Sequence, residues 1–217
     1  LTWIAFFLTF VVWFNLAPLA TTVKADLGLT VGQIRTVAIC NVALTIPARV
    51  LIGMLLDKFG PRITYSSILV FSAIPCLLFA SAQDFNQLVV ARLLLSIVGA
   101  GFVIGIRMVA EWFPPKEIGL AEGIYGGWGN FGSAFSALTM VALAGFLSFS
   151  GGFELPTGAV LNWRGAIALT GIVSAVYGCF YFFNVTDTPP GKTYQRPEKT
   201  AGLSLIHISE PTRLSWI

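Results

Sequence analysis

Long uninterrupted apolar runs limit this chain to folds whose solvent is largely lipid. Several runs reach the roughly 18 residues that an α-helix needs to cross a hydrocarbon core about 30 Å thick. Hydrophobic residues fill 56% of the 217 positions and charged residues only 11%, which is more apolar surface than a soluble domain of this size could bury. The runs are too long and too continuous for the alternating strands of a membrane barrel, so they predict membrane-spanning helices.

Hydropathy and helix-breaking residues divide the chain into six predicted spans. We place them at residues 3–23, 34–56, 63–82, 87–112, 119–148 and 163–184. The predicted fold class is an all-α membrane protein, with a six-transmembrane-helix bundle over residues 1–185. Pro47 and Pro75 lie inside predicted spans and are expected to kink them, and Asn15 and Pro18 raise the same expectation in the first span.

The two ends of the chain differ from its middle. The chain opens at Leu1 inside an apolar run and has no initiator methionine, which predicts a fragment of a longer protein. Residues 186–203 are polar and predict a cytoplasmic linker. Residues 204–217 resemble translated sequencing-adapter text, so this predicted non-native tail is left out of the functional reasoning, together with His207, the only histidine.

The basic residues predict the orientation of the bundle. Lys58 and Arg62 lie in one loop, Lys116 lies in another, and further cations follow the last span, so these segments are expected on the cytoplasmic side of an inner membrane. The net charge of +3 is spread over loops and forms no stripe, which argues against a nucleic-acid partner. The expected environment is the lipid bilayer.

The reactive residue types indicate neither an enzyme nor a metal protein. The three cysteines, Cys40, Cys76 and Cys179, sit singly inside apolar runs and have neither disulfide nor metal-site spacing. No set of residues offers a nucleophile with a base, or a metal cluster. We therefore predict no catalytic residues, no metal and no cofactor.

The loop between the second and third spans carries the most specific motif. It reads Gly53-Met-Leu-Leu-Asp57-Lys58-Phe-Gly60-Pro61-Arg62, which resembles the signature loop of the major facilitator superfamily, G-x-x-x-D-R/K-x-G-R/P-R/K. In physical terms, Gly53 is expected to allow close helix approach, Asp57 to cap a helix end and Gly60 to make the turn. The resemblance implies that this loop latches two halves of a transporter in one gating state.

Two further motifs extend the resemblance. The fourth span begins with Arg92 and has Gly99 and Gly101 seven to nine residues later, which resembles a second superfamily motif, so Arg92 joins the predicted gating set. The fifth span reads Gly126-Gly127-Trp128-Gly129-Asn130-Phe131-Gly132, and its Gly-Trp-Gly-Asn-x-Gly core resembles the nitrate signature of the nitrate/nitrite porter family. The resemblance implies the N-terminal half of a twelve-helix fold, with a C-terminal six-helix half missing from this sequence. It also implies a secondary transporter that moves nitrate or nitrite by alternating access.

Arg49 is predicted to be the deepest charge and the anchor for a transported anion. It lies eight residues before Asp57, which corresponds to about 12 Å inside the membrane core. Arg92 and Arg107 lie about 7 to 8 Å from the ends of span four, from where they are expected to snorkel to an interface. No Asp or Glu shares the predicted depth of Arg49, so its expected partner is an anion from outside the chain. An arginine that caps carbonyls or pairs with the missing half is the alternative.

The remaining candidate substrate contacts come mainly from span five. Asn130 shares the predicted depth of Arg49, and its amide can donate to an anion oxygen. Close to it, Gly126, Gly127 and Gly129 are further candidate contacts. The small residues of one helical face leave space for substrate or admit another helix, and they are Gly123, Gly126, Ser133, Ala134 and Ala137. Two rings, Tyr125 and Phe14, are candidates to sandwich a flat anion. A helix-packing face is the alternative for Asn130 and the glycines, and core packing is the alternative for the rings.

The sequence leaves the exact function open. Another small anion or a drug would fit the loop motif, and a nontransporting membrane nitrate sensor would fit the fold. Nitrate-for-nitrite exchange and proton symport both remain alternatives, because no midplane carboxylate or histidine is predicted in this half.

Overall fold

The computed structural model describes residues 1–156 and 158–191, and the predicted tail and most of the predicted linker lie outside this part. Within the described residues, six helical segments are long and apolar enough to cross a membrane. They are Thr2–Asp26, Val31–Phe59, Pro61–Ser81, Phe85–Trp112, Ile118–Ser150 and Trp163–Asn184. Each boundary lies within three residues of the predicted one, and the predicted all-α fold class is confirmed.

Three spans are broken, and a proline explains each break. Helix α1 ends at Phe14, α3 ends at Ala43 and α5 ends at Phe71, in each case four residues before a proline. Proline has no N–H to donate to the carbonyl four residues earlier, and its ring clashes with that carbonyl. The elements of these spans are α1 Thr2–Phe14, η1 Ala17–Leu19, α2 Ala20–Asp26, α3 Val31–Ala43, α4 Thr45–Phe59, α5 Pro61–Phe71 and α6 Ala73–Ser81.

Span four is also broken, although no proline lies in it. A short 3-10 segment interrupts the helix where Gly99 packs against Trp13, and a Cβ built on this glycine would lie 2.8 Å from Cζ2 of the indole. The later elements are α7 Phe85–Ser96, η2 Ile97–Ala100, α8 Gly101–Trp112, α9 Ile118–Phe146, η3 Leu147–Ser150 and α10 Trp163–Asn184. Between the last two spans, β1 Phe153–Glu154 pairs antiparallel with β2 Val160–Leu161.

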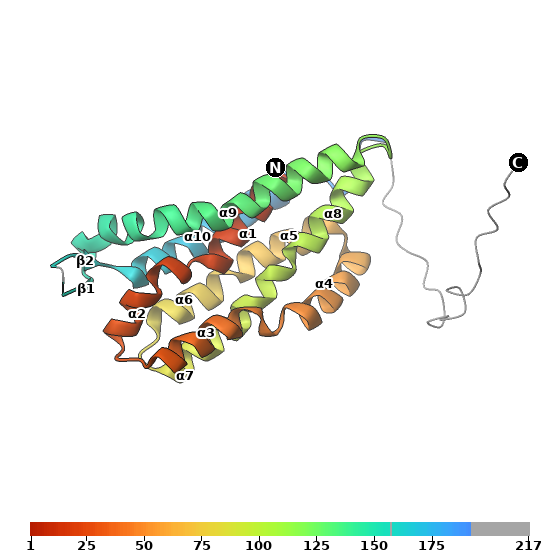
Figure 1. The fold of residues 1–217 in the computed structure, drawn as a ribbon. Helices are drawn as coiled ribbons and strands as arrows, with labels where there is room; N and C mark the ends of the chain where they lie inside the picture. Colours follow the sequence, from red (N-terminus) through yellow and green to blue (C-terminus); the bar gives the residue numbers. More distant parts are fainter. Residues whose placement is uncertain (157, 192–217) are drawn as a thin grey trace, which may run out of the picture.

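The six spans form one bundle whose two ends are distinct (Figure 1). Helix α1 packs on α9, α10 packs on α5 and α6, and α3 packs on α7. One end carries the β1–β2 hairpin, and we call it the hairpin end. The other carries the turn at Gly60 and the end of α10, and we call it the Gly60 end. This second end holds the loops predicted to be cytoplasmic.

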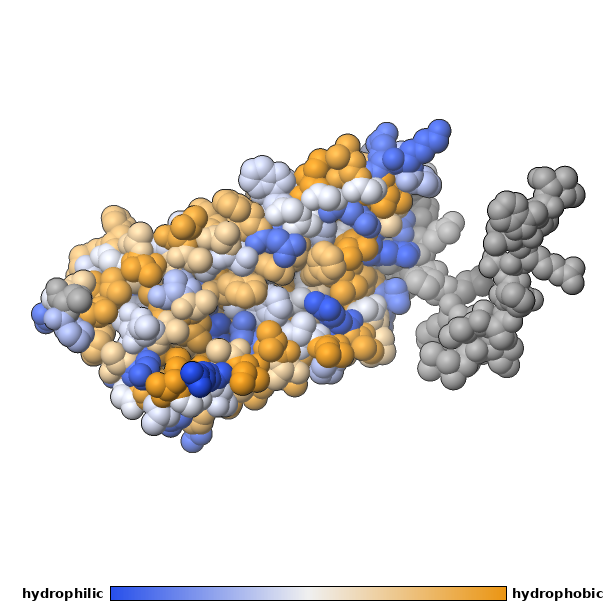
Figure 2. All heavy atoms as spheres, viewed as in Figure 1, coloured by the Kyte–Doolittle hydropathy of each residue, from blue (hydrophilic) through white to orange (hydrophobic). Residues whose placement is uncertain are grey.

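Spans two and five are the least buried of the six. Only 22% of the most apolar stretch of each is buried inside the bundle, against 39–56% for the other four spans. Apolar residues cover much of the face seen in Figure 2, and hydrophilic residues gather at the Gly60 end and are scattered among the apolar ones. Large exposed apolar surfaces of this kind need lipid or another protein surface to cover them.

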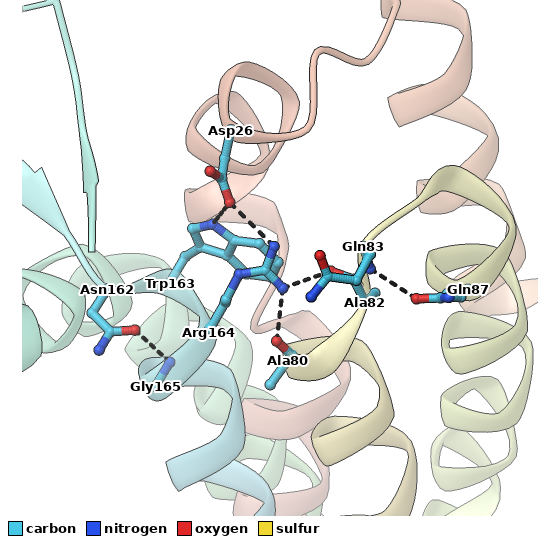
Figure 3. Close-up of polar contacts among 9 residues, drawn as sticks. All are labelled: Asp26, Ala80, Ala82, Gln83, Gln87, Asn162, Trp163, Arg164 and Gly165. Atoms are coloured by element: carbon cyan, nitrogen blue, oxygen red, sulfur yellow. Dashed lines mark hydrogen bonds and ion pairs between the residues drawn. The ribbon is translucent and has the colours of Figure 1, made fainter. Parts of the chain in front are cut away.

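Three spans are joined at the hairpin end by one polar cluster (Figure 3). The indole Nε1 of Trp163 donates to Asp26 Oδ2 at 2.8 Å. The guanidinium of Arg164 lies 3.4 Å from the same oxygen and donates to the carbonyls of Ala80 and Ala82 at 2.8 and 2.6 Å. These contacts connect the ends of spans one and three to the start of span six.

Candidate functional site

Arg49, the predicted anion anchor, lies on the exposed side of α4. Its neighbours Ile46 and Val50 are 78% and 64% exposed, so Arg49 lies within an exposed, largely apolar surface of the bundle. Among the described residues, no carboxylate lies within ion-pair distance of Arg49. The side chain is therefore open to a partner from outside this half.

Arg92 is placed differently from the prediction, because it is fully buried and does not snorkel to an interface. Its Nη2 donates to Asn15 Oδ1 at 2.9 Å and its Nη1 to Asn41 Oδ1 at 3.3 Å, and its Cζ lies 4.3 Å from the centre of the Phe79 ring. The expectation rested on counting residues from the span end, but depth along the helix says nothing of which neighbours cover a side chain. Arg107 lies nearer the surface and pairs with Glu111 at 2.9 Å.

Asn130 and two of the candidate glycines lie on the outer side of α9. Asn130 is exposed, and its Nδ2 donates to the carbonyl of Gly126 at 2.8 Å, which leaves Oδ1 and the second N–H of the amide for other partners. A Cβ added at Gly126 or Gly127 would meet nothing within 4 Å. This side of α9 is available to a substrate or to another helix.

Gly129 and Gly132 lie on the opposite, buried side of α9, where they pack on α1. A Cβ at Gly129 would collide with the ring of Phe6, and one at Gly132 would collide with the backbone carbonyl of Phe7. Small residues let two helix backbones approach closely in a membrane. The structure thus places Gly129 in a helix-packing contact, which is the alternative that the sequence left open for the glycines.

Tyr125 also lies in the interior. Its ring stacks on Phe6 with centroids 4.8 Å apart, and its hydroxyl lies 3.3 Å from that of Tyr65. A cavity of about 470 Å³ at the Gly60 end includes Tyr125 in its lining, but neither Arg49 nor Asn130. Phe14 is half-buried at the end of α1, where it contacts Trp13 with ring centroids 5.1 Å apart. Within the described residues, neither the Tyr125 ring nor the Phe14 ring makes a cation–π contact with Arg49.

The predicted gating loop forms a tight turn around Gly60, as expected. Gly60 has φ +84° and joins the end of α4 to the start of α5. The backbone N–H of Arg62 donates to Asp187 Oδ1 at 2.6 Å, and the Arg62 guanidinium lies 4.8 Å from the centre of the Phe182 ring. The residue that caps this helix start is therefore Asp187, from the segment predicted as linker.

Two roles expected in this loop are not observed within the described part of the chain. Asp57 was expected to cap a helix end, but it is exposed next to Lys58 and makes no hydrogen bond there. Gly53 was expected to allow close helix approach, but a Cβ at this position would meet nothing within 4 Å. Among the described residues, nothing approaches Gly53 or the Asp57 side chain in this way.

The comparisons with known proteins decide the family. The sequence model of the Major Facilitator Superfamily matches residues 2–216. The chain belongs to the major facilitator superfamily. The membership agrees with the resemblance carried by the Gly53–Arg62 loop, and it makes this bundle part of a multi-pass membrane transporter fold.

Two similar relatives are proteins named nitrate/nitrite transporter NrtP. The one from Picosynechococcus sp. is 61% identical over 219 residues, which cover 94% of this chain and 41% of the relative. The one from Nostoc punctiforme is 59% identical over 207 residues, which cover 95% of this chain and 40% of the relative. The chain thus spans about two fifths of the length of these two relatives.

A solved transporter structure shares the fold at low sequence identity. It is a bacterial homologue of the human lysosomal transporter Spinster, in an inward-facing and occupied conformation. The TM-score is 0.66 at 19% identity, over 88% of this chain and 44% of that chain. This likeness concerns the arrangement of the helices alone.

Proposed function

We propose that this chain is the N-terminal part of a secondary transporter that moves nitrate or nitrite, or both, across the cytoplasmic membrane by alternating access. The observation that carries the proposal is the identity of about 60% to two proteins named nitrate/nitrite transporter, over more than nine tenths of the chain. The Gly-Trp-Gly-Asn-x-Gly run in α9 supports the same substrate. No chemical step is assigned to the chain, since these relatives carry the names of transporters.

Arg49 is the residue that we assign to the anion. It lies ten residues from the end of span two at Phe59, which corresponds to about 15 Å from the Gly60 end of the bundle. A guanidinium at this depth is costly unless it meets an anion or a carboxylate. Nitrate is planar with three acceptor oxygens, and the planar fork of arginine donors matches it better than an ammonium group does.

Asn130 is the second donor that we assign to the site. It lies twelve residues from the start of span five, which corresponds to about 18 Å from the Gly60 end, close to the depth of Arg49. Both side chains are exposed, and they belong to the two least buried spans. A second six-helix half that packs against these spans would bury both donors and close the site between the halves.

The test is nitrate uptake by proteoliposomes that contain the full-length parent or its Arg49→Lys variant. We expect the lysine variant to lose at least about tenfold in kcat/KM for nitrate, because the fork is lost while the charge is kept. The matched control is Arg35→Lys, an exposed arginine on the same span but near the hairpin end, which should leave uptake unchanged. Uptake by Arg49→Lys at the rate of the parent would remove Arg49 from the site.

The same assay separates the alternatives. Uptake of another small anion in preference to nitrate would assign a different substrate to the same fold. Nitrate binding without flux would identify a nontransporting sensor. Loading the vesicles with nitrite, with and without a pH gradient, distinguishes nitrate-for-nitrite exchange from proton symport.

A further inference from the structure

Arg92 is a fully buried cation whose guanidinium donates hydrogen bonds to two side-chain amides. It lies near the breaks in the spans. Its two acceptors are Asn15, the residue that follows α1, and Asn41, near the end of α3. Among the described residues, no carboxylate lies within ion-pair distance of Arg92, and its Nε has no hydrogen-bond partner. A buried charge is retained only where polar groups face it, so the two amides are specific requirements of this cation.

One of these amides, Asn41, also satisfies a backbone group that a helix break leaves free. The last four carbonyls of a helix have no donor within that helix, and a membrane offers no water to replace it. Asn41 Nδ2 donates to the carbonyl of Trp13 at 2.8 Å, and the Trp13 indole donates to the carbonyl of Asn41 at 2.7 Å. The ends of α1 and α3 are thus joined through one reciprocal pair.

The break in span two is held on both of its sides. On the near side, Asn41 is bonded to Arg92 of span four and to Trp13 of span one. On the far side, the Thr45 hydroxyl donates to the carbonyl of Ser96, where span four itself breaks. Between these contacts lies Leu44, with φ −96° and ψ 6°, which turns α3 into α4.

Arg49 lies four residues after Thr45 in the uninterrupted helix α4. The direction that α4 takes as it leaves the break therefore determines where this guanidinium lies. We propose that Arg92 is a positioning residue for the anion site: through Asn41 it fixes the break in span two and so places Arg49. This inference rests on the proposed function for the role of Arg49 in anion binding. The claim that Arg92 fixes the position of Arg49 does not depend on the identity of the substrate.

The first experiment compares KM and Vmax for nitrate uptake by the reconstituted full-length parent with those of its Arg92→Lys and Asn41→Ala variants. We expect both variants to raise KM about tenfold, because a misplaced Arg49 binds the anion less well. A merely structural network would lower the yield of folded protein and leave KM unchanged. Should Arg92→Lys fail to fold, Asn41→Ala decides, since it keeps the arginine and removes one acceptor.

The matched control is Ser174→Ala. This buried hydroxyl pairs with Ser72 at 2.9 Å, at the break in span three, and contacts neither Arg92 nor span two. It should leave KM for nitrate as in the parent. A rise in KM equal to that of Asn41→Ala would show that any buried hydrogen bond at this level has the effect, and would overturn the specific role of Arg92.

The second experiment measures the position of residue 49 without nitrate. The thiol in Arg49→Cys, with Cys40 and Cys179 replaced by serine, is labelled by a water-soluble maleimide in the full-length protein. Adding Asn41→Ala should change the labelling rate about fivefold or more, and adding Ser174→Ala should not. A rate that Asn41→Ala leaves unchanged overturns the positioning role.

The two experiments separate this inference from the proposed function. If Arg49→Lys transports nitrate like the parent while the labelling rate at position 49 responds to Asn41→Ala, the positioning stands and the anion role fails. If Arg49→Lys is impaired while Asn41→Ala changes neither KM nor the labelling rate, the anion role stands and the positioning fails.

Discussion

Asp187 accepts a hydrogen bond from the backbone N–H of Arg62 at 2.6 Å, across 125 residues of sequence. The contact ties the segment after span six to the first turn of span three. A carboxylate at this place satisfies one of the free N–H groups of α5 and interacts favourably with the positive end of the helix dipole. The turn that carries the superfamily motif is therefore supported from outside the motif.

Asp187→Ala should destabilise the Gly60 end of the bundle. Loss of a side-chain acceptor at a helix start typically costs about 1 kcal/mol, so we expect a lower melting temperature for the detergent-solubilised full-length parent. Asp187→Asn is the control, because it keeps the Oδ1 acceptor and should recover most of the loss. Equal melting temperatures for the alanine variant and the parent would mean that this hydrogen bond contributes nothing.

The spans and the breaks at prolines could be predicted from the sequence for a definite reason, whereas the break in span four could not. Apolar length is a strong local signal, and each boundary lies within three residues of its prediction. The expected kinks at Pro47 and Pro75 are breaks, because the loss of a backbone donor does not depend on the rest of the fold. The effect of a residue on its own helix can therefore be predicted from the sequence alone.

The partners of the buried polar groups could not be predicted in the same way. Asn41 is 51 residues from Arg92 and Asp187 is 125 residues from Arg62, and no local pattern brings either pair together. One available signal was missed: Asn15 and Asn41 are amides inside apolar spans, so each requires a hydrogen-bond partner within the bundle. For the candidate site, the structure exposes Arg49 and Asn130 on spans two and five, and the roles of both residues stay predictions.

Gly129→Ala and Gly127→Ala should have opposite effects, although the residues are two apart in the same helix. A Cβ at Gly129 collides with Phe6, and overpacking of this kind costs about 1 to 3 kcal/mol. A Cβ at Gly127 meets nothing within 4 Å, and alanine is favoured over glycine in a helix by about 1 kcal/mol. Melting temperatures of the two variants measure the difference. A Gly129→Ala variant as stable as the parent would contradict the close packing of α1 on α9.

Arg164→Lys should weaken the hairpin end although it keeps the charge. The guanidinium reaches Asp26 and the carbonyls of Ala80 and Ala82 at once, which a single ammonium on a flexible stem cannot reproduce (Figure 3). We expect a lower melting temperature and faster hydrogen exchange at the end of α6. Lys24→Arg, a conservative change near the same end that alters none of these contacts, should leave both measurements as in the parent.

Gly60→Ala should cost more stability than Gly28→Ala, because two penalties add at Gly60 and only one applies at Gly28. Gly60 has φ +84° and ψ 165°, a region that is almost closed to residues with a Cβ, and a Cβ there would lie 3.0 Å from the Asp187 carboxylate. Gly28 has φ +59° and no neighbour within 4 Å of a Cβ, so only the backbone cost of about 1 kcal/mol applies. We expect the melting temperature to fall clearly more in Gly60→Ala than in Gly28→Ala. This difference in melting temperature should become smaller in an Asp187→Ala background, because the carboxylate that crowds the new Cβ is then absent. Equal losses for the two glycines in the parent background would contradict the contact between the motif turn and the segment after span six.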